Sequence, residues 1–154
     1  MIVLDTNVVS ELRLPNPDSN VTAWFGAQQE KDLVVASFSI AEIEYGIALV
    51  RHRGVLAEHL TGWLDAILAT QHILPLDGNS ARILGQLHSI PALRHLITAP
   101  AQARRPRFAG DLAIAATAAA HHASVATRNL ADFRLIATHC PGLAGMSPWT
   151  GETF

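Results

Sequence analysis

The chain of 154 residues has the length of a single domain. Hydrophobic residues make up 49% and charged residues 16%, which excludes a disordered chain, because disorder requires low hydrophobicity and high charge. The 11 Lys and Arg residues against 13 Asp and Glu give a formal net charge of −2, which excludes a nucleic-acid binder that relies on diffuse positive charge.

The first half of the chain alternates short apolar runs with amphipathic segments. In chain order we predict a strand at 2–4, a helical turn at 6–14, a helix at 18–29, a strand at 33–36, and helices at 39–50 and 55–69. The turn at 6–14 is expected to stop at Pro15 and Pro17. Gly54 separates the last two helices, each of which carries an apolar face.

The second half continues the alternation. We predict a strand at 73–76, a helix capped by Asn79 and ended or kinked by Pro91, a loop at 98–109, a helix at 111–121, a strand at 124–127 and a short helix at 131–138. Pro75 favours an edge or terminal position for its strand, because proline donates no ladder hydrogen bond. The tail holds Gly142, Gly145 and Pro148 and is predicted to be mostly loop.

Strands that alternate with helices favour the α/β class. We predict a three-layer α/β/α sandwich with a mainly parallel central sheet of four or five strands, formed by one domain over residues 1–154. In such sheets, sites form at the carboxyl ends of strands, near a change in strand order. This rule points to three segments: 5–7, 37–42 and 127–129.

Three acidic residues stand where strands end or helices begin: Asp5, Glu42 and Asp111. Each has a structural explanation, because Asp5 and Asp111 can cap helices and the sequence from Ser39 to Glu42 matches the S-x-x-E capping box. Their joint placement favours convergence on one crevice. Clustered carboxylates repel one another unless a cation joins them, and Mg²⁺ takes oxygen ligands, of which one or two are usually carboxylates.

Four short motifs occur in order along the chain: Asp5-Thr6-Asn7, Ala41-Glu42-Ile43-xx-Gly46, Asp111-xx-Ile114-Ala115-Ala116-Thr117-Ala118 and Thr127-Arg128-Asn129-xx-Asp132-Phe133. In this order and spacing they resemble the PIN-domain ribonucleases, specifically the VapC-type toxins of bacterial toxin–antitoxin pairs. The resemblance covers the chain from Met1 to about Trp149. It implies a PIN-like fold and a metal-dependent endoribonuclease that cleaves RNA with Mg²⁺ or Mn²⁺.

The resemblance also implies roles for individual residues. By motif, the catalytic, metal-binding acids fall on Asp5, Glu42 and Asp111. Asn7 is similar to the residue that orients the first Asp through a side-chain amide, and Thr127 is similar to the small hydroxyl residue close to the metal.

The sequence departs from the family pattern at two places. Asn129 occupies a position that is often Asp in the family, so Asn129 and Asp132 are expected to be weaker metal ligands, and the number of metals stays open. The approach to the third acid, from 98 to 108, is longer and richer in Pro and Arg than is usual in the family. Its arginines form either a solvated loop or a clamp for substrate phosphate; they are Arg104, Arg105 and Arg107.

The three tryptophans are expected to pack rather than to bind bases. Trp24 and Trp63 lie on apolar helical stripes, which is typical of core residues. Trp149 resembles the final Pro-Trp of the family and is expected to pack the tail, residues 139–154, onto the body of the domain.

The resemblance implies four partners: an RNA substrate, a cognate antitoxin, a second copy in a homodimer, and operator DNA reached only through the antitoxin. The alternative is a non-catalytic, Mg-binding α/β module that acts in signalling, or as a co-repressor with a partner protein on DNA. A receiver-like signalling domain would use a lysine near the acidic pocket, whereas the sole lysine, Lys31, precedes the second predicted strand. The single cysteine, Cys140, fits a reducing compartment, and we expect a cytoplasmic protein with no membrane contact.

Overall fold

The computed structural model describes residues 1–97 and 110–154; the predicted loop at 98–109, with its three arginines, lies outside these ranges. The described residues form a five-stranded sheet of β1 (Ile2–Leu4), β2 (Leu33–Ala36), β3 (His72–Leu74), β4 (Ser124–Ala126) and β5 (Gly145–Met146). The strand order is β3-β2-β1-β4-β5, and all four neighbouring pairs are parallel. The predicted parallel sheet is therefore confirmed, and β3 lies at an edge, as Pro75 indicates.

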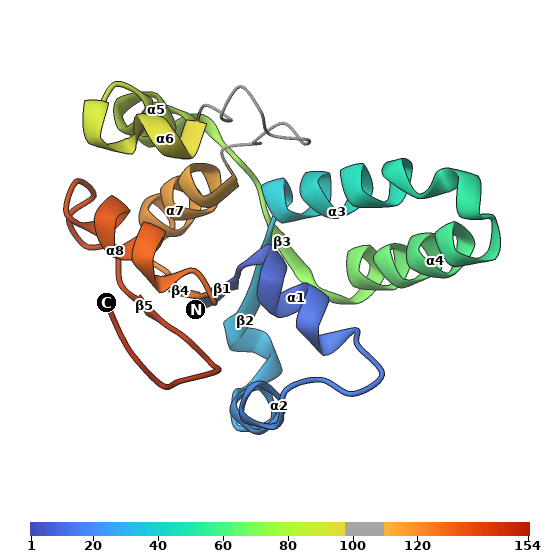
Figure 1. The fold of residues 1–154 in the computed structure, drawn as a ribbon. Coiled ribbons are helices and arrows are strands. Elements are labelled where there is room, and N and C mark those ends of the chain that lie inside the picture. The colour runs from blue at the N-terminus through green and yellow to red at the C-terminus, as the bar shows by residue number, and fades with distance from the viewer. Residues whose placement is uncertain (98–109) are drawn as a thin grey trace.

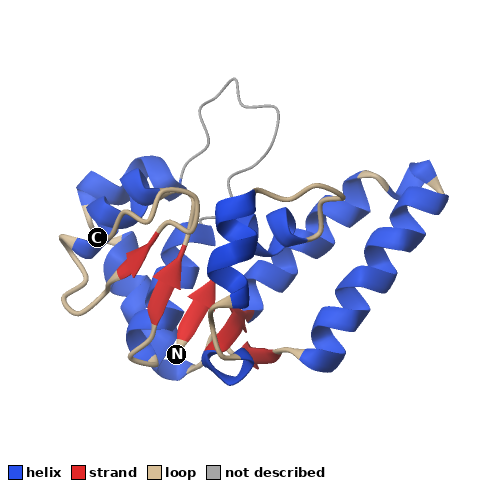
Figure 2. Cartoon of the chain, turned by 90° about the horizontal axis from the view of Figure 1, so that it is seen from below, coloured by secondary structure: helices blue, strands red, loops and turns tan. Residues whose placement is uncertain are grey.

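Helices cover both faces of this sheet (Figures 1 and 2). One face carries α1 (Thr6–Leu12), α2 (Ser19–Gly26), α3 (Ser37–Leu49) and α4 (Val55–Thr70), and the other carries α5 (Gly78–His88), α6 (Arg94–Ile97), α7 (Gly110–Ala120) and α8 (Leu130–Ala137). Alternation along β1 divides the core: Val3 packs with α5–α8, and Leu4 packs with α1–α4. The three-layer α/β/α sandwich is thus confirmed.

The change in strand order falls beside β1. The chain runs from β1 outward to β2 and β3, then returns to place β4 and β5 on the other side of β1. The backbone N–H of Asp5 donates to the carbonyl of Ala126 at 3.0 Å, which ties the carboxyl ends of β1 and β4 together. A crevice is expected at this point, because the helices that follow the two strands leave in different directions.

Helix α3 begins earlier than the sequence indicates. It starts at Ser37 directly after β2, with the buried Ala36 at its N-cap position. Ser39 therefore lies inside the first turn, and its buried hydroxyl has no hydrogen-bond partner among the described residues. The capping-box explanation for Glu42 is wrong. The box requires Ser39 to be the N-cap residue, whereas the N-cap residue is Ala36 and no side chain caps the helix.

Helix α5 is capped by a different residue from the one predicted. Asp77 occupies the N-cap position, and its Oδ1 accepts from the backbone N–H and the hydroxyl of Ser80 at 2.9 and 2.8 Å. These hydrogen bonds, led by the one from the Ser80 backbone, lower the pKa of Asp77. The prediction for Asn79 is wrong, because the helix starts at Gly78 and already includes Asn79.

The tail contains a strand that was predicted as loop. Residues Gly145 and Met146 form β5 against β4, and glycine permits this approach, because a Cβ on Gly145 would overlap the carbonyl oxygen of Val125. Trp149 is half-buried against the α1–α4 face of the core, as are Trp24 and Trp63, so the packing predicted for the tryptophans is confirmed. In the described ranges no helix has the length and apolar character that a bilayer crossing requires.

Candidate active site

Asp5 stands at the centre of a polar network where β1 ends. Asp5 is 2% exposed and occupies the N-cap position of α1, but its side chain accepts no capping hydrogen bond. Instead, Oδ2 accepts from the amide nitrogen of Asn7 at 2.6 Å and from the hydroxyl of Thr127 at 2.6 Å. Asn7 is held in turn, because its Oδ1 accepts from the backbone N–H of Arg128 at 3.0 Å. The carboxylate is therefore oriented from α1, through Asn7, and from the segment that follows β4, through Thr127.

Glu42 approaches the same edge of the sheet from α3. Its Oε2 accepts from the hydroxyl of Thr6 at 2.5 Å. Helix α7 also passes close by: a Cβ on Gly110 would stand 2.6 Å from Cδ of Glu42, nearer than real Cβ contacts come. The missing side chain at Gly110 is what leaves space for the Glu42 carboxylate beside the start of α7.

Asp111 follows Gly110 in the first turn of α7, and an amide links it to the fourth motif. The Nδ2 of Asn129 donates to Oδ2 of Asp111 at 2.9 Å and to Oδ2 of Asp132 at 2.7 Å. The backbone N–H of Asn129 donates to the hydroxyl of Thr127 at 2.9 Å. Asn129 thus holds two acids together as a hydrogen-bond donor, in a position where a carboxylate would repel both.

The charges of neighbouring acids contribute to the pKa values of Asp5 and Glu42. Burial is the main cause that raises the pKa of Asp5 from 3.8 to about 6; the Thr127 hydroxyl opposes the rise, and the charge of Glu42 adds to it. Burial also raises the pKa of Glu42, against the hydrogen bond from Thr6, and the charge of Asp111 adds to this rise. Burial, with the repulsion between the acids added to it, therefore disfavours the ionised forms of Asp5 and Glu42.

A divalent ion fits this donor set. Within the described residues, no group of three or more His, Cys, Asp or Glu side chains is placed to hold one ion jointly. Mg²⁺ does not need such a group, because it keeps several waters and usually binds one or two carboxylates directly. Burial is the main cause that raises the pKa of Asp5 and Glu42, and repulsion between the acids adds to it; a cation beside them would stabilise the ionised carboxylates against both effects. Asp5, Glu42 and Asp111 are the residues that would hold it, directly or through water.

The structure brings most of the predicted site residues to one edge of the sheet. Hydrogen bonds tie Asn7, Thr127 and Asn129 into the network around the acids, and Asp132 lies on its far side, beyond Asn129. Arg104, Arg105 and Arg107 lie outside the described residues. The motifs alone give no role to Thr6 and Gly110; the sequence signal for them is that each stands directly beside one of the acids, Asp5 and Asp111.

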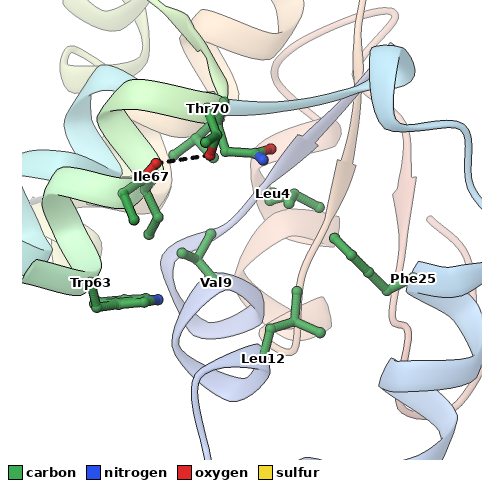
Figure 3. A pocket seen from close by; sticks show the side chains of 10 residues that line it. Leu4, Val9, Leu12, Phe25, Trp63, Ile67 and Thr70 are labelled. Carbon is green, nitrogen blue, oxygen red and sulfur yellow. Dashed lines mark hydrogen bonds between the residues drawn. The ribbon is translucent and has the colours of Figure 1, made fainter.

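A separate apolar cavity of about 190 Å³ opens on the α1–α4 face (Figure 3). None of the three acids lines it; its walls are Leu4, Val9, Leu12, Phe25, Val35, Trp63, Ala66, Ile67, Thr70 and Gln71.

Comparison with known proteins identifies the family. The family model described as PIN domain matches residues 2–138, so the chain belongs to the PIN-domain family. The chain is 34% identical over 152 residues to the VapC ribonuclease Y4jK of Sinorhizobium fredii, covering 97% of this chain and 98% of that protein. It is also 34% identical over 152 residues to the toxin FitB of Neisseria gonorrhoeae, covering 97% and 99%. The solved structure of FitAB bound to an IR36 DNA fragment matches with a TM-score of 0.69 and 33% identity, over 99% of this chain and 98% of that one.

Proposed function

We propose that this chain is the ribonuclease toxin of a toxin–antitoxin pair, and that it cleaves RNA phosphodiester bonds with Mg²⁺ or Mn²⁺ held by Asp5, Glu42 and Asp111. The observation that carries the proposal is the convergence of these acids at the change in strand order, with Asp5 buried and its pKa raised to about 6. Relatives named ribonuclease and toxin, similar over nearly the whole chain, support the same activity.

A divalent ion in this crevice supplies activation of water and neutralises the charge that develops on the scissile phosphate. The chain's own residues supply the geometry. Thr127 and Asn7 fix the Asp5 carboxylate, and Thr6 fixes that of Glu42, so neither acid has to be ordered during the reaction. Asn129 holds Asp111 in place while adding no negative charge. As in the family that the sequence resembles, products with a 5′-phosphate and a 3′-hydroxyl are expected.

A co-repressor role with a partner protein is the second candidate function of this chain. It is favoured by the similar gonococcal protein, which is solved as FitAB bound to DNA. We propose a cognate antitoxin, a homodimer, and operator DNA bound only through the antitoxin. The exposed apolar side chains of the α3–α4 region support a protein partner; they are Leu49, Val55, Leu56 and Leu68. We propose a cytoplasmic location, because the proposed substrate is cellular RNA and the single cysteine fits a reducing compartment.

Phosphoryl signalling is disfavoured by the position of the sole lysine. Lys31 is exposed in the turn at 30–32 that precedes β2, and so lies toward the amino end of that strand. The acids lie at the carboxyl ends of the strands, on the opposite edge of the sheet. A lysine that served the acidic crevice would have to lie on that edge.

Expression without the antitoxin tests the proposal. RNA 5′ ends are sequenced from cells that make the wild type, Glu42→Gln or Glu44→Gln; Glu44 is an exposed acid on the same helix and serves as the matched control. The wild type and Glu44→Gln are expected to produce the same new 5′-phosphate ends and to arrest growth, and Glu42→Gln is expected to produce neither. New ends that persist at wild-type level in Glu42→Gln would refute the proposed active site.

A further inference from the structure

Arg128 lies between two residues that hold the acids. Thr127 on one side donates to Asp5, and Asn129 on the other donates to Asp111. The backbone of Arg128 is fixed as well, because its N–H donates to Oδ1 of Asn7 at 3.0 Å. The side chain therefore starts from a rigid point at the rim of the acidic crevice, and it is exposed to solvent.

The guanidinium of Arg128 rests on an aromatic platform. It lies over the ring of Trp149, 5.2 Å from the ring centroid. Trp149 is itself anchored, because it packs half-buried on the α1–α4 core and its carbonyl accepts from Nδ2 of Asn20 at 2.9 Å. Stacking of this kind removes much of the rotamer freedom that an exposed arginine would otherwise lose on binding a ligand.

The charge of Arg128 is not matched by a carboxylate in the described part of the chain. The ion pairs found there join Arg134 to Glu152 and His121 to Asp77. The adjacent crevice holds several acids, which repel the phosphates of an approaching RNA. A guanidinium beside these acids can hold the RNA strand next to the scissile bond, because it binds phosphate oxygens in a bidentate manner.

We propose that Arg128, positioned by Trp149, binds a backbone phosphate of the RNA next to the scissile one. This inference rests on the proposed ribonuclease function. It makes Arg128 a substrate-binding residue and Trp149 a positioning residue. It also explains why the tail is tied back to α2 through Asn20, since without that anchor the platform under the guanidinium would be mobile.

The test measures RNA binding separately from cleavage. A labelled single-stranded RNA oligonucleotide of mixed sequence is titrated, at several salt concentrations and in EDTA, into the cleavage-deficient Asp111→Asn protein. Arg128→Ala or Arg128→Gln is then added to this background. The matched control is Arg13→Ala. The guanidinium of Arg13 also lies over a tryptophan ring, 5.4 Å from the ring centroid of Trp63, but Arg13 is at the opposite end of α1 from Asp5.

Arg128→Ala and Arg128→Gln are expected to raise the Kd for RNA roughly three- to tenfold. They are also expected to reduce the slope of log K against log salt by about 0.7, the value for one contact to a single strand. Arg128→Lys should keep the salt slope while weakening binding, because it retains the charge and loses the bidentate geometry. Arg13→Ala should change neither quantity. In otherwise wild-type enzyme, Trp149→Leu should raise KM for cleavage more than it lowers kcat.

Equal Kd and salt slope in folded Arg128→Gln and its parent would overturn the inference, as would an equal loss in Arg13→Ala. Loss of thermal stability in Arg128→Ala without any change in RNA binding would show that the arginine only anchors the tail. If the wild type does not cut RNA, the proposed ribonuclease function is wrong. If the wild type cuts RNA and Arg128→Gln cuts it with the same KM, only the role proposed for Arg128 is wrong.

Discussion

Replacing Asp5 with Asn is expected to stabilise the metal-free protein at neutral pH while abolishing cleavage. Burial raises the pKa of Asp5 from 3.8 to about 6, so the folded protein holds this proton more tightly than the unfolded chain does. The resulting contribution to stability is fully present below about pH 4 and is lost as the pH rises through about 6. Asn cannot ionise, and its amide oxygen can still accept from Asn7 and Thr127.

The size of the effect follows from the same values. Each tenfold change in the protonation equilibrium is worth 1.36 kcal/mol, so the ionised Asp5 costs the folded state about 3 kcal/mol at pH 7. For a chain of this size that corresponds to a rise in Tm of about 6–12 °C in the variant. Below pH 4, where Asp5 is protonated in both states, the two proteins should be equally stable.

Urea unfolding in EDTA between pH 4 and pH 8 measures this difference. Asp65→Asn, at an exposed position on α4, is the control and should follow the wild type throughout. Millimolar Mg²⁺ in place of EDTA should narrow the gap, because the ion stabilises the wild type by mass action. If Asp5→Asn is less stable than the wild type at pH 7, or if the two proteins differ by the same amount at pH 4 and pH 7, ionised Asp5 does not destabilise the folded state.

Three further predictions concern the groups around the acids. Gly110→Ala should displace the Glu42 carboxylate and lower kcat about a hundredfold without loss of fold. Gly85→Ala is the control, because a Cβ there has open space, and it should leave kcat unchanged. Equal kcat in the two variants would show that Gly110 does not make room for Glu42. Thr6→Val removes the hydrogen bond that lowers the pKa of Glu42, so the acidic limb of the pH–rate profile should move to higher pH, and an unmoved limb would count against the contact. Asn129→Asp replaces a donor with a charge, so thermal melting should show a lower Tm in EDTA and a larger gain on adding Mg²⁺ than in the wild type; a Tm in EDTA no lower than that of the wild type would show that the amide bridge does not stabilise the acids.

The sequence predicts which strands end at the site, because strands are recognised from local apolar patterns. Apolar runs that end at Asp5 and before Thr127 define strands, and the parallel arrangement then brings their carboxyl ends to one edge. The strand β5 escapes prediction, because two residues carry no period and pairing with β4 depends on the space left by Gly145.

The errors at helix starts have one cause. Sequence places Ser39 and Asn79 at N-caps because their residue types favour that position, but the actual boundary depends on where the preceding strand leaves the sheet. A shift of two or three residues changes a predicted cap into an interior position. Because Ser39 is not the cap of α3, Glu42 is not part of a capping box and instead accepts a hydrogen bond from Thr6. These two residues are 36 positions apart, so sequence spacing does not reveal their contact.

Cleavage of RNA by the purified protein is the direct test of a metal-dependent ribonuclease site at Asp5, Glu42 and Asp111. RNA is incubated in Mg²⁺ or in EDTA with one of four proteins, and the ends of the products are identified. The proteins are the wild type, Asp5→Asn, Asp111→Asn and the exposed-acid control Glu44→Gln. We predict that the wild type and Glu44→Gln cleave only with Mg²⁺ and leave 5′-phosphates, and that the two site variants do not cleave. Cleavage in EDTA, or cleavage by Asp5→Asn and Asp111→Asn at the wild-type rate, would contradict the account.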